Sequence, residues 1–369
     1  MVYLDNAATT FPKPRSVIDS VNDCIRNYCA NSGRSSHRLA IITDNEIYST
    51  REAISSLLTL NAPENVCFTT NATYAINMAL KSLITKKCHI LTSDTEHNSI
   101  IRPLKRMRES IGITFSSFST DGDLYSNIEG LITEKTRAIA STLASNVTGK
   151  EIPIDILAKI AAKHKLILIA DASQILGHKN ISMENVDRGV ICAPGHKGLF
   201  GIQGCGFAAF KGITPAATFA EGGSGSQSRS TDMPRDLPER LEAGTLPTPA
   251  IVSLKAGIEY VKSLTLDAIE KRIFEATELF KSRLADIDDL EIFACENGII
   301  SFRIKDEPIA KTASYLDSCE IYVREGLHCA PMAHRKLGTE KSGLIRVSLS
   351  VFNNKKDADA LWKSLKTRL

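Results

Sequence analysis

The chain has 369 residues, 43% of them hydrophobic, which is enough to bury a large core in one or two domains. Its 45 basic and 42 acidic residues are scattered and leave a net charge of +3, so no basic tail or stripe indicates nucleic-acid binding. No stretch approaches the ~20 uninterrupted apolar residues of a membrane-spanning helix, which argues against a membrane protein.

The N-terminus and the cysteines bear on the cellular compartment. The first ten residues contain no basic segment followed by an apolar run, which predicts a soluble protein that is not exported. The nine cysteines are an odd number, and several lie in apolar stretches, as buried cysteines do, which favours a reducing cytoplasm. His328, Cys329 and His334 lack the second tight pair of a closed zinc site, so we expect no metal.

The first half of the chain predicts helices followed by alternating strands and helices. Apolar residues at helical spacing predict a helix over 15–30. Thr43 and Glu46 have capping-box spacing, which predicts a second helix from Thr43 to about Pro63. The alternation that follows is typical of a mostly parallel sheet covered on both faces. The predicted strands are 66–69, 89–92, 113–118, 138–143, 166–170, 190–193 and 206–210, the last two close enough to pair antiparallel, and the predicted helices are 75–83 and 156–164.

The second half changes character at residues 221–240. Glycines and serines are followed there by mixed charges and prolines with few apolar side chains, which predicts a mobile surface loop. Helices at 250–263 and 266–284 come next, and a C-terminal segment has its own strand–helix pattern. A second, smaller domain therefore begins at about residue 267.

Two residues after predicted strands suggest a cofactor site. Asp171 follows the strand 166–170, and ligands of open α/β sheets bind beyond the carboxyl ends of strands. Lys197 lies in a glycine-rich turn, where a lysine that loses its proton forms a Schiff base. Alone, Asp171 also fits a turn cap and Lys197 a solvated loop charge. Together they supply the carboxylate and the amine that pyridoxal 5′-phosphate (PLP) requires at its ring nitrogen and its aldehyde.

Two further segments after strands fit the same cofactor. Thr73 lies at the start of the helix near 75–83, where unpaired N–H groups and the helix dipole form an anion site for a phosphate. Thr and Asn are also ordinary N-caps at such a position. His97 follows the strand 89–92, and its flat ring, titratable near neutrality, suits stacking on a pyridine ring and proton transfer. A lone histidine is more often structural.

Eight motifs in this order resemble those of the cysteine desulfurases and selenocysteine lyases of the class V aminotransferases. They are residues 4–10, 71–77, 96–98, 145–149, 171–174, 195–197, 242–245 and 346–353. The resemblance implies the aspartate-aminotransferase-like α/β fold of type I PLP enzymes. It also implies a large PLP-binding domain over 14–265, with a mostly parallel sheet. A small α+β domain would comprise 1–13 and 266–369, in a homodimer with shared active sites.

The resemblance implies a role for each residue of the cofactor site. Lys197 would be the Schiff-base lysine, Asp171 would pair with the pyridine nitrogen, and His97 would stack on the ring. Gln174 would contact the phenolic oxygen. The phosphate would be held by the Ala72 backbone, Thr73 and His196, with Thr245 from a second subunit.

Substrate and sulfur transfer are assigned by the same resemblance. Asn146, Arg324 and Arg346 would bind the amino acid, Arg346 through a bidentate contact with its α-carboxylate. Cys329 lies in a short loop beside Arg324 and His328, and such basic neighbours favour a thiolate. A spare surface thiol is the alternative. In the family, the matching cysteine takes the sulfur of PLP-bound L-cysteine as a persulfide, leaves L-alanine, and passes the sulfur to an acceptor protein.

Three residues depart from the family pattern. Pro194 replaces a hydroxyl residue of the phosphate site and offers neither hydroxyl nor N–H. Ala72 replaces a threonine, although its backbone is still able to serve. Leu327 replaces a histidine before His328, which leaves the subgroup and the preferred acceptor open.

The expected function is a PLP-dependent cysteine desulfurase, and three alternatives stay open. A selenocysteine lyase acting on L-selenocysteine shares the same site. A cysteine or cystine C–S lyase needs no thiol nucleophile, so the presence of Cys329 argues against it. A non-catalytic scaffold would have no need of Asp171, Lys197 and Arg346.

Overall fold

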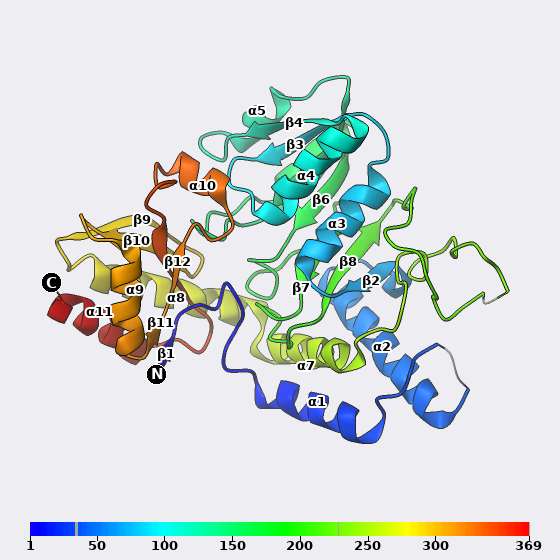
Figure 1. The fold of residues 1–369 in the computed structure, drawn as a ribbon, viewed down its shortest axis with the longest axis horizontal. Helices are drawn as coiled ribbons and strands as arrows, with labels where there is room; N and C mark the ends of the chain where they lie inside the picture. The colour runs from blue at the N-terminus through cyan, green and yellow to red at the C-terminus, as the bar shows by residue number, and fades with distance from the viewer. Residues whose placement is uncertain (34–35, 228, 369) are drawn as a thin grey trace.

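The computed structural model describes residues 1–33, 36–227 and 229–368, and within them the strands form three sheets (Figure 1). The largest sheet has the order β2-β8-β7-β6-β5-β3-β4. Strands β3 to β7 run parallel, which confirms the mostly parallel sheet expected from the sequence. Strand β8 pairs antiparallel with β7, the pairing that the sequence left open, and also with β2, which the sequence did not predict. The seven strands are β2 (Val66–Thr69), β3 (His89–Ser93), β4 (Thr114–Phe118), β5 (Thr136–Thr142), β6 (Ile167–Asp171), β7 (Gly189–Pro194) and β8 (Gly206–Lys211).

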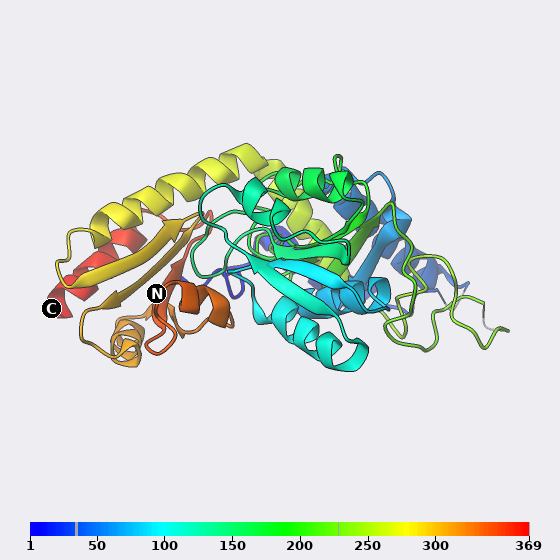
Figure 2. The same cartoon turned by 90° about the horizontal axis from the view of Figure 1, so that it is seen from above.

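Helices cover both faces of this sheet, each over its own apolar core (Figure 2). Successive side chains of a strand point to opposite faces, so Leu168 of β6 enters one core and Ile169 the other. One face carries α3 (Ala72–Leu83) and α4 (Asn98–Ile111), and the other α2 (Arg38–Leu57), α5 (Leu124–Glu129), α6 (Ile154–Lys163) and α7 (Thr248–Leu264). Helix α1 (Arg15–Asn27) lies along α7.

The C-terminal part of the chain builds around an antiparallel sheet of order β12-β13-β10-β9. Its core includes Phe280, Ile300, Phe302 and Leu361. A separate pair joins β1 (Val2–Tyr3) to β11 (Ile321–Tyr322), so the N-terminal strand lies among C-terminal elements. The remaining elements are α8 (Leu266–Leu284), β9 (Leu290–Glu296), β10 (Ile299–Ile304), α9 (Ile309–Ser318), β12 (Arg324–Gly326), α10 (Pro331–Lys336), β13 (Leu344–Ser348) and α11 (Lys355–Arg368), besides a short 3-10 turn at Pro63–Asn65. The domain limits given above stay a prediction.

The second helix begins earlier than the sequence predicted. Helix α2 begins at Arg38, and the His37 side chain accepts a hydrogen bond from the N–H of Ala40 at 3.3 Å. Thr43 is buried inside the helix, where its hydroxyl donates to the carbonyl of Leu39 at 2.9 Å. The capping-box spacing was misleading because a threonine hydroxyl inside a helix is able to bond the carbonyl one turn back.

Between β8 and α7 the described residues form no helix or strand. The predicted loop 221–240 falls here, and its residue 228 lies outside the described residues. Its mobility stays a prediction.

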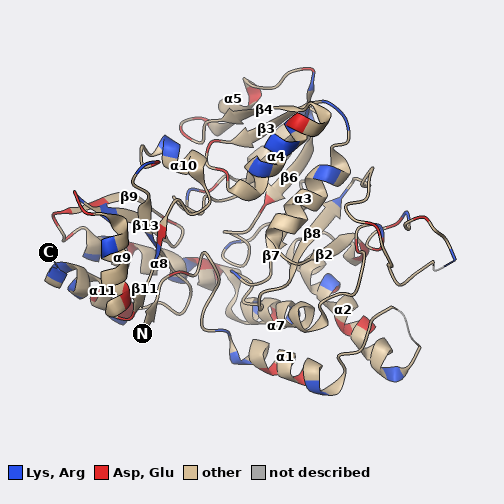
Figure 3. Ribbon diagram, viewed as in Figure 1, with Lys and Arg blue, Asp and Glu red and all other residues tan. Residues whose placement is uncertain are grey.

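Charge is mixed over the molecule. Figure 3 shows basic and acidic residues together on several helices, among them α1 and α2, with a local basic run on α4. Of the helices in the described ranges, none combines the length and the apolar character needed to cross a membrane.

A buried ion pair between Arg51 and Glu242 attaches the end of the segment between β8 and α7 to α2 and β2. The two terminal nitrogens of Arg51 on α2 donate to the two carboxylate oxygens of Glu242 at 2.8 and 2.6 Å. The Phe68 N–H of β2 donates to the same carboxylate at 2.5 Å. Both charged side chains are only 7% exposed, so each charge is stabilised by its partner in place of water.

Removing one partner of this pair should destabilise the fold. In Glu242→Ala the Arg51 guanidinium stays buried without its carboxylate, so the free energy of unfolding in urea should fall by about 3–5 kcal/mol. Asp19→Ala is the control, because its partner Arg15 is 87% exposed, and it should change stability by less than about 1 kcal/mol. Equal losses in the two variants would contradict this prediction.

Candidate active site

One cavity gathers most of the predicted site residues. It lies at the carboxyl ends of the parallel strands and the starts of α3 and α4, the place where ligands bind in open α/β sheets. The predicted residues that line it are Ala72, Thr73, His97, Asn146, Asp171, Gln174, His196 and Lys197. Thr245, Arg324, Cys329 and Arg346 are not among its lining residues.

Lys197 stands in a tight turn after β7. A Cβ atom on Gly198 would lie 2.3 Å from the Leu176 carbonyl oxygen, so the turn requires glycine directly after the lysine. Burial lowers the pKa of Lys197 to about 8, although the nearby Asp171 carboxylate opposes the shift. The amine is therefore far more often neutral than that of a free lysine.

Asp171 ends β6 and is held by neutral donors. It is 3% exposed, one oxygen accepts from the N–H of Ser173 at 2.9 Å and from the Ser173 hydroxyl, and the other accepts from the Ser99 hydroxyl at 3.4 Å. Sequence reasoning missed Ser99 and Ser173, which also line the cavity. Each stands two residues after a predicted residue, the spacing of a side chain that bonds the backbone two residues on, and this spacing was the available signal.

His97 is the N-cap of α4 as well as a wall of the cavity. Its Nδ1 accepts from the Ser99 N–H at 3.1 Å, so the neutral ring carries its proton on Nε2. Burial lowers the pKa of His97 to about 4, with Lys197 adding to the shift and Asp171 opposing it. The ring is thus neutral at pH 7, in contrast to the titration near neutrality expected from the sequence.

The start of α3 forms an anion site that fits a phosphate. The first N–H groups of a helix have no partner inside it, and those of Ala72 and Thr73 occupy this position. Nearby, His196 Nδ1 is a buried nitrogen for which the described residues offer no hydrogen-bond partner. A Cβ atom on Gly206 would lie 2.7 Å from the Asn71 carbonyl carbon, so glycine lets β8 approach this helix start closely. The amine, the carboxylate and the anion site together fit PLP.

Arg346 and Asn146 already have protein partners. Arg346 is 1% exposed, its Nη2 donates to the Asp5 carboxylate at 2.7 Å, and its Nη1 donates to the Asn146 carbonyl at 3.0 Å. Its Nε is buried with no partner among the described residues. The Asn146 side chain donates to the His328 carbonyl at 2.7 Å. A guanidinium has five N–H donors, so Arg346 keeps donors for a substrate, and Arg324 lies opposite it in the β12–β13 pair.

Cys329 is exposed and lies in a short loop with unusual backbone conformation. His328 and Cys329 have φ values of 49° and 55°, in the left-handed region. The Asn98 N–H donates to the Cys329 carbonyl at 2.8 Å, which fixes the loop one residue beyond His97. Thr245 is also exposed, in the segment before α7.

Curated relatives align over nearly the whole chain. A probable cysteine desulfurase of Streptomyces coelicolor is 30% identical over 383 residues, covering 98% of this chain and 90% of the relative. A probable cysteine desulfurase of Halalkalibacterium halodurans is 29% identical over 379 residues, covering 99% and 92%.

Solved structures share the fold. The apo structure of a cysteine desulfurase from Thermococcus onnurineus NA1 has a TM-score of 0.87 at 24% identity, covering 100% of this chain and 94% of that one. A cysteine desulfurase of Escherichia coli, in an S-sulfonic acid form, has a TM-score of 0.88 at 23% identity, covering 99% and 94%. The predicted fold class is confirmed. Since the model of the aminotransferase class-V family matches residues 2–361, the chain belongs to that family.

Proposed function

We propose that this protein is a PLP-dependent cysteine desulfurase that converts L-cysteine to L-alanine and takes the sulfur onto Cys329. Relatives named probable cysteine desulfurases, aligned with almost the entire chain, support this activity. The observation that carries it is the tethering of the Cys329 loop to Asn98, at the edge of the cavity that contains Lys197 and Asp171.

The cavity residues divide the contacts with the cofactor among them. Lys197 would attach it, Asp171 would pair with the ring nitrogen, and Gln174 would face the phenolic oxygen. The N–H groups of Ala72 and Thr73, with His196, would hold the phosphate. When bound, PLP supplies an electron sink that weakens the Cβ–S bond of the attached amino acid.

The chain's own groups would carry the proton and sulfur transfers. Arg346, with Arg324 beside it, would hold the substrate carboxylate. The Lys197 amine would accept the proton of Cα, which a pKa of about 8 permits near neutral pH. The Cys329 thiolate would then form a bond to the substrate sulfur as the Cβ–S bond breaks and leaves its electron pair on the carbon side. Cβ would gain a proton, and the Lys197 amine would return a proton to Cα, which gives alanine and a persulfide on Cys329.

The same proposal includes a homodimer in the cytoplasm and a protein that accepts the sulfur. Helices α1 and α2 expose large apolar side chains, which favours cover by a second copy. They are Ile18, Ile25, Leu39, Ile41 and Tyr48, each 45–59% exposed. The exposed Thr245 would complete the phosphate site of the other subunit.

Lys197→Ala should abolish covalent attachment of the cofactor. After borohydride reduction the wild type should carry PLP on Lys197 by mass spectrometry, and the variant should carry none. Lys13→Ala is a control, because Lys13 also has a pKa lowered to about 8 by burial but does not line the cavity. Normal attachment in Lys197→Ala would contradict the assignment.

The rate at which the apoprotein captures PLP should follow the protonation of Lys197. Only the neutral amine adds to an aldehyde, so the rate should rise with pH and level off above about pH 8, measured by absorbance with a borohydride quench. A rate that still rises tenfold per pH unit up to pH 10 would instead indicate that the pKa of Lys197 is near the usual lysine value of 10.5.

Cys329→Ser should separate substrate binding from turnover. The variant should bind L-cysteine, seen as a spectral change of the holoenzyme, but should lose alanine production by at least ~100-fold, because a serine hydroxyl is a poor nucleophile toward sulfur. Cys29→Ser is the matched control, since Cys29 is also exposed and should be dispensable. Alanine formed at the wild-type rate by Cys329→Ser would favour a C–S lyase mechanism.

A further inference from the structure

The Cys329 loop, residues 327–330, and the helix α10 that follows it form one unit held together by its own hydrogen bonds and ring contacts. The N–H of Ala330 donates to the Leu327 carbonyl at 2.8 Å, and the N–H of Thr339 donates to the His334 carbonyl at 2.8 Å. The rings of His328 and His334 stack with their centroids 5.4 Å apart, and both residues are buried. Hydrogen bonds and ring stacking therefore connect the end of α10 with the residues on either side of Cys329.

One end of this unit is attached to the loop that follows β3. The Asn98 N–H holds the carbonyl of Cys329, as described above, directly beside His97. The Asn146 side chain holds the carbonyl of His328. These contacts hold the backbone at the thiol, and Ala330 and Ala333, both buried, pack against Val147 and Leu344 at the start of α10.

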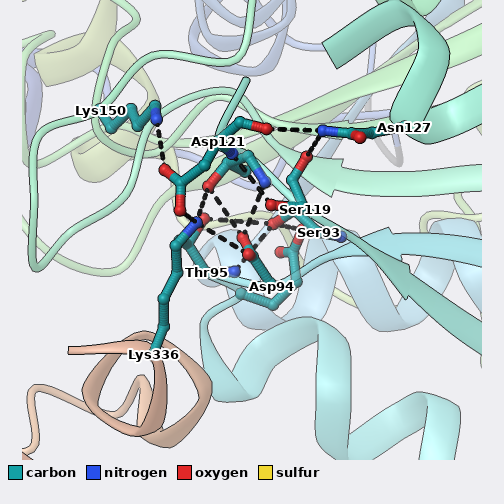
Figure 4. A network of polar contacts seen from close by, with 10 residues as sticks. Ser93, Asp94, Thr95, Ser119, Asp121, Asn127, Lys150 and Lys336 are labelled. Carbon is teal, nitrogen blue, oxygen red and sulfur yellow. Dashed lines mark hydrogen bonds and ion pairs between the residues drawn. The ribbon is translucent and has the colours of Figure 1, made fainter. Parts of the chain in front are cut away.

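The other end is attached through Lys336, the last residue of α10 (Figure 4). Its amine contacts the Asp94 carboxylate at 2.8 Å, the Thr120 hydroxyl at 2.7 Å and the Asp121 carboxylate at 2.8 Å. Asp94 in turn accepts from the Thr120 hydroxyl at 2.8 Å, and Lys150 contacts the second oxygen of Asp121 at 2.8 Å. Lys336 thus lies at the centre of a closed polar network.

Opposite charges stabilise the contacts of Lys336 with Asp94 and Asp121. The side chains of Lys336 and Asp94 are 22% and 24% exposed, so solvent screens them less than an ordinary surface pair. Burial opposes the charge of Lys336, but its bonds to Asp121 and Asp94 prevail and raise its pKa. Three contacts on one amine, two of them to carboxylates, restrict the helix end more than a single exposed ion pair does.

Asp94 directly follows β3 and Asn98 is the first residue of α4, so the two residues bound the connection that contains His97. The unit that contains Cys329 is therefore attached to this connection at both ends, by the Asn98 N–H and by Lys336. We propose that Lys336 is a positioning residue, which sets the place of the Cys329 thiol relative to the cavity by holding α10 to Asp94 and Asp121. This inference rests on the proposed function, in which Cys329 accepts the sulfur.

The test compares Lys336→Met with Arg335→Met in the holoenzyme. Arg335 is on the same helix, but it is 70% exposed and pairs with Glu340 of its own segment, so it is a matched control. Lys336→Met should bind L-cysteine like the wild type but form alanine about 10 to 100-fold more slowly, since small misplacements of reacting groups have effects of this size. Persulfide formation on Cys329 should slow equally.

Three further measurements separate positioning from a general loss of structure. Lys336→Arg, which keeps a cation at the helix end, should recover part of kcat. Asp94→Asn added to Lys336→Met should slow turnover no further, because the two residues act through one contact. Should Lys336→Met fail to fold, Asp121→Asn removes one of the two carboxylates from an exposed position and should show a smaller fall in kcat with KM unchanged.

The outcomes distinguish this inference from the proposed function. Wild-type kcat in Lys336→Met, or an equal loss of L-cysteine binding and turnover, would overturn the positioning role. Absence of alanine and of the Cys329 persulfide in the wild type itself would overturn the proposed function, and the positioning role with it. Normal wild-type chemistry with a selective fall of kcat in Lys336→Met supports both.

Discussion

The buried carboxylate of Asp171 is the constraint around which the site is arranged. It lies at the end of a central parallel strand, where water is excluded and its charge needs compensation. The hydrogen bonds it accepts come from Ser173 and Ser99, both neutral donors. A cationic ring nitrogen in the cavity would satisfy it electrostatically. Its bond to Ser99 also reaches α4, so the same carboxylate helps to place His97 at the start of that helix.

Much of the fold and part of the site could be predicted because both depend on local patterns. Short apolar runs alternating with helices define a parallel sheet, and the carboxyl ends of its strands meet at one edge, which brings Asp171 and Lys197 together. The beginning of α2 was predicted wrongly because the Thr43 hydroxyl bonds the carbonyls of Leu39, one turn back, and of Tyr28, at the end of α1, which the spacing to Glu46 does not reveal. Ser99 and Ser173 were missed although each stands two residues after a predicted residue, because the sequence reasoning did not use this spacing.

Individual polar contacts between distant parts of the chain could not be predicted from local patterns. Lys336 and Asp94 are 242 residues apart, and Arg346 and Asp5 are 341 apart. Nothing in local composition distinguishes Lys336 from Arg335, yet one connects two parts of the fold and the other pairs within its own segment. The Asp5 contact likewise shows that Arg346 is held in place before any substrate arrives.

The attachment of Cys329 has a consequence for how sulfur would leave the site. A loop whose carbonyl is bonded to Asn98 and whose following helix is tied through Lys336 cannot swing far without breaking charged contacts. Cys329 is nevertheless exposed, so the thiol is at the surface while its backbone is fixed. If Cys329 carries sulfur as proposed, these contacts favour an acceptor that approaches the exposed thiol over a loop that reaches outward. Leu327, which is exposed in the same loop, would then be among the first side chains that the acceptor meets.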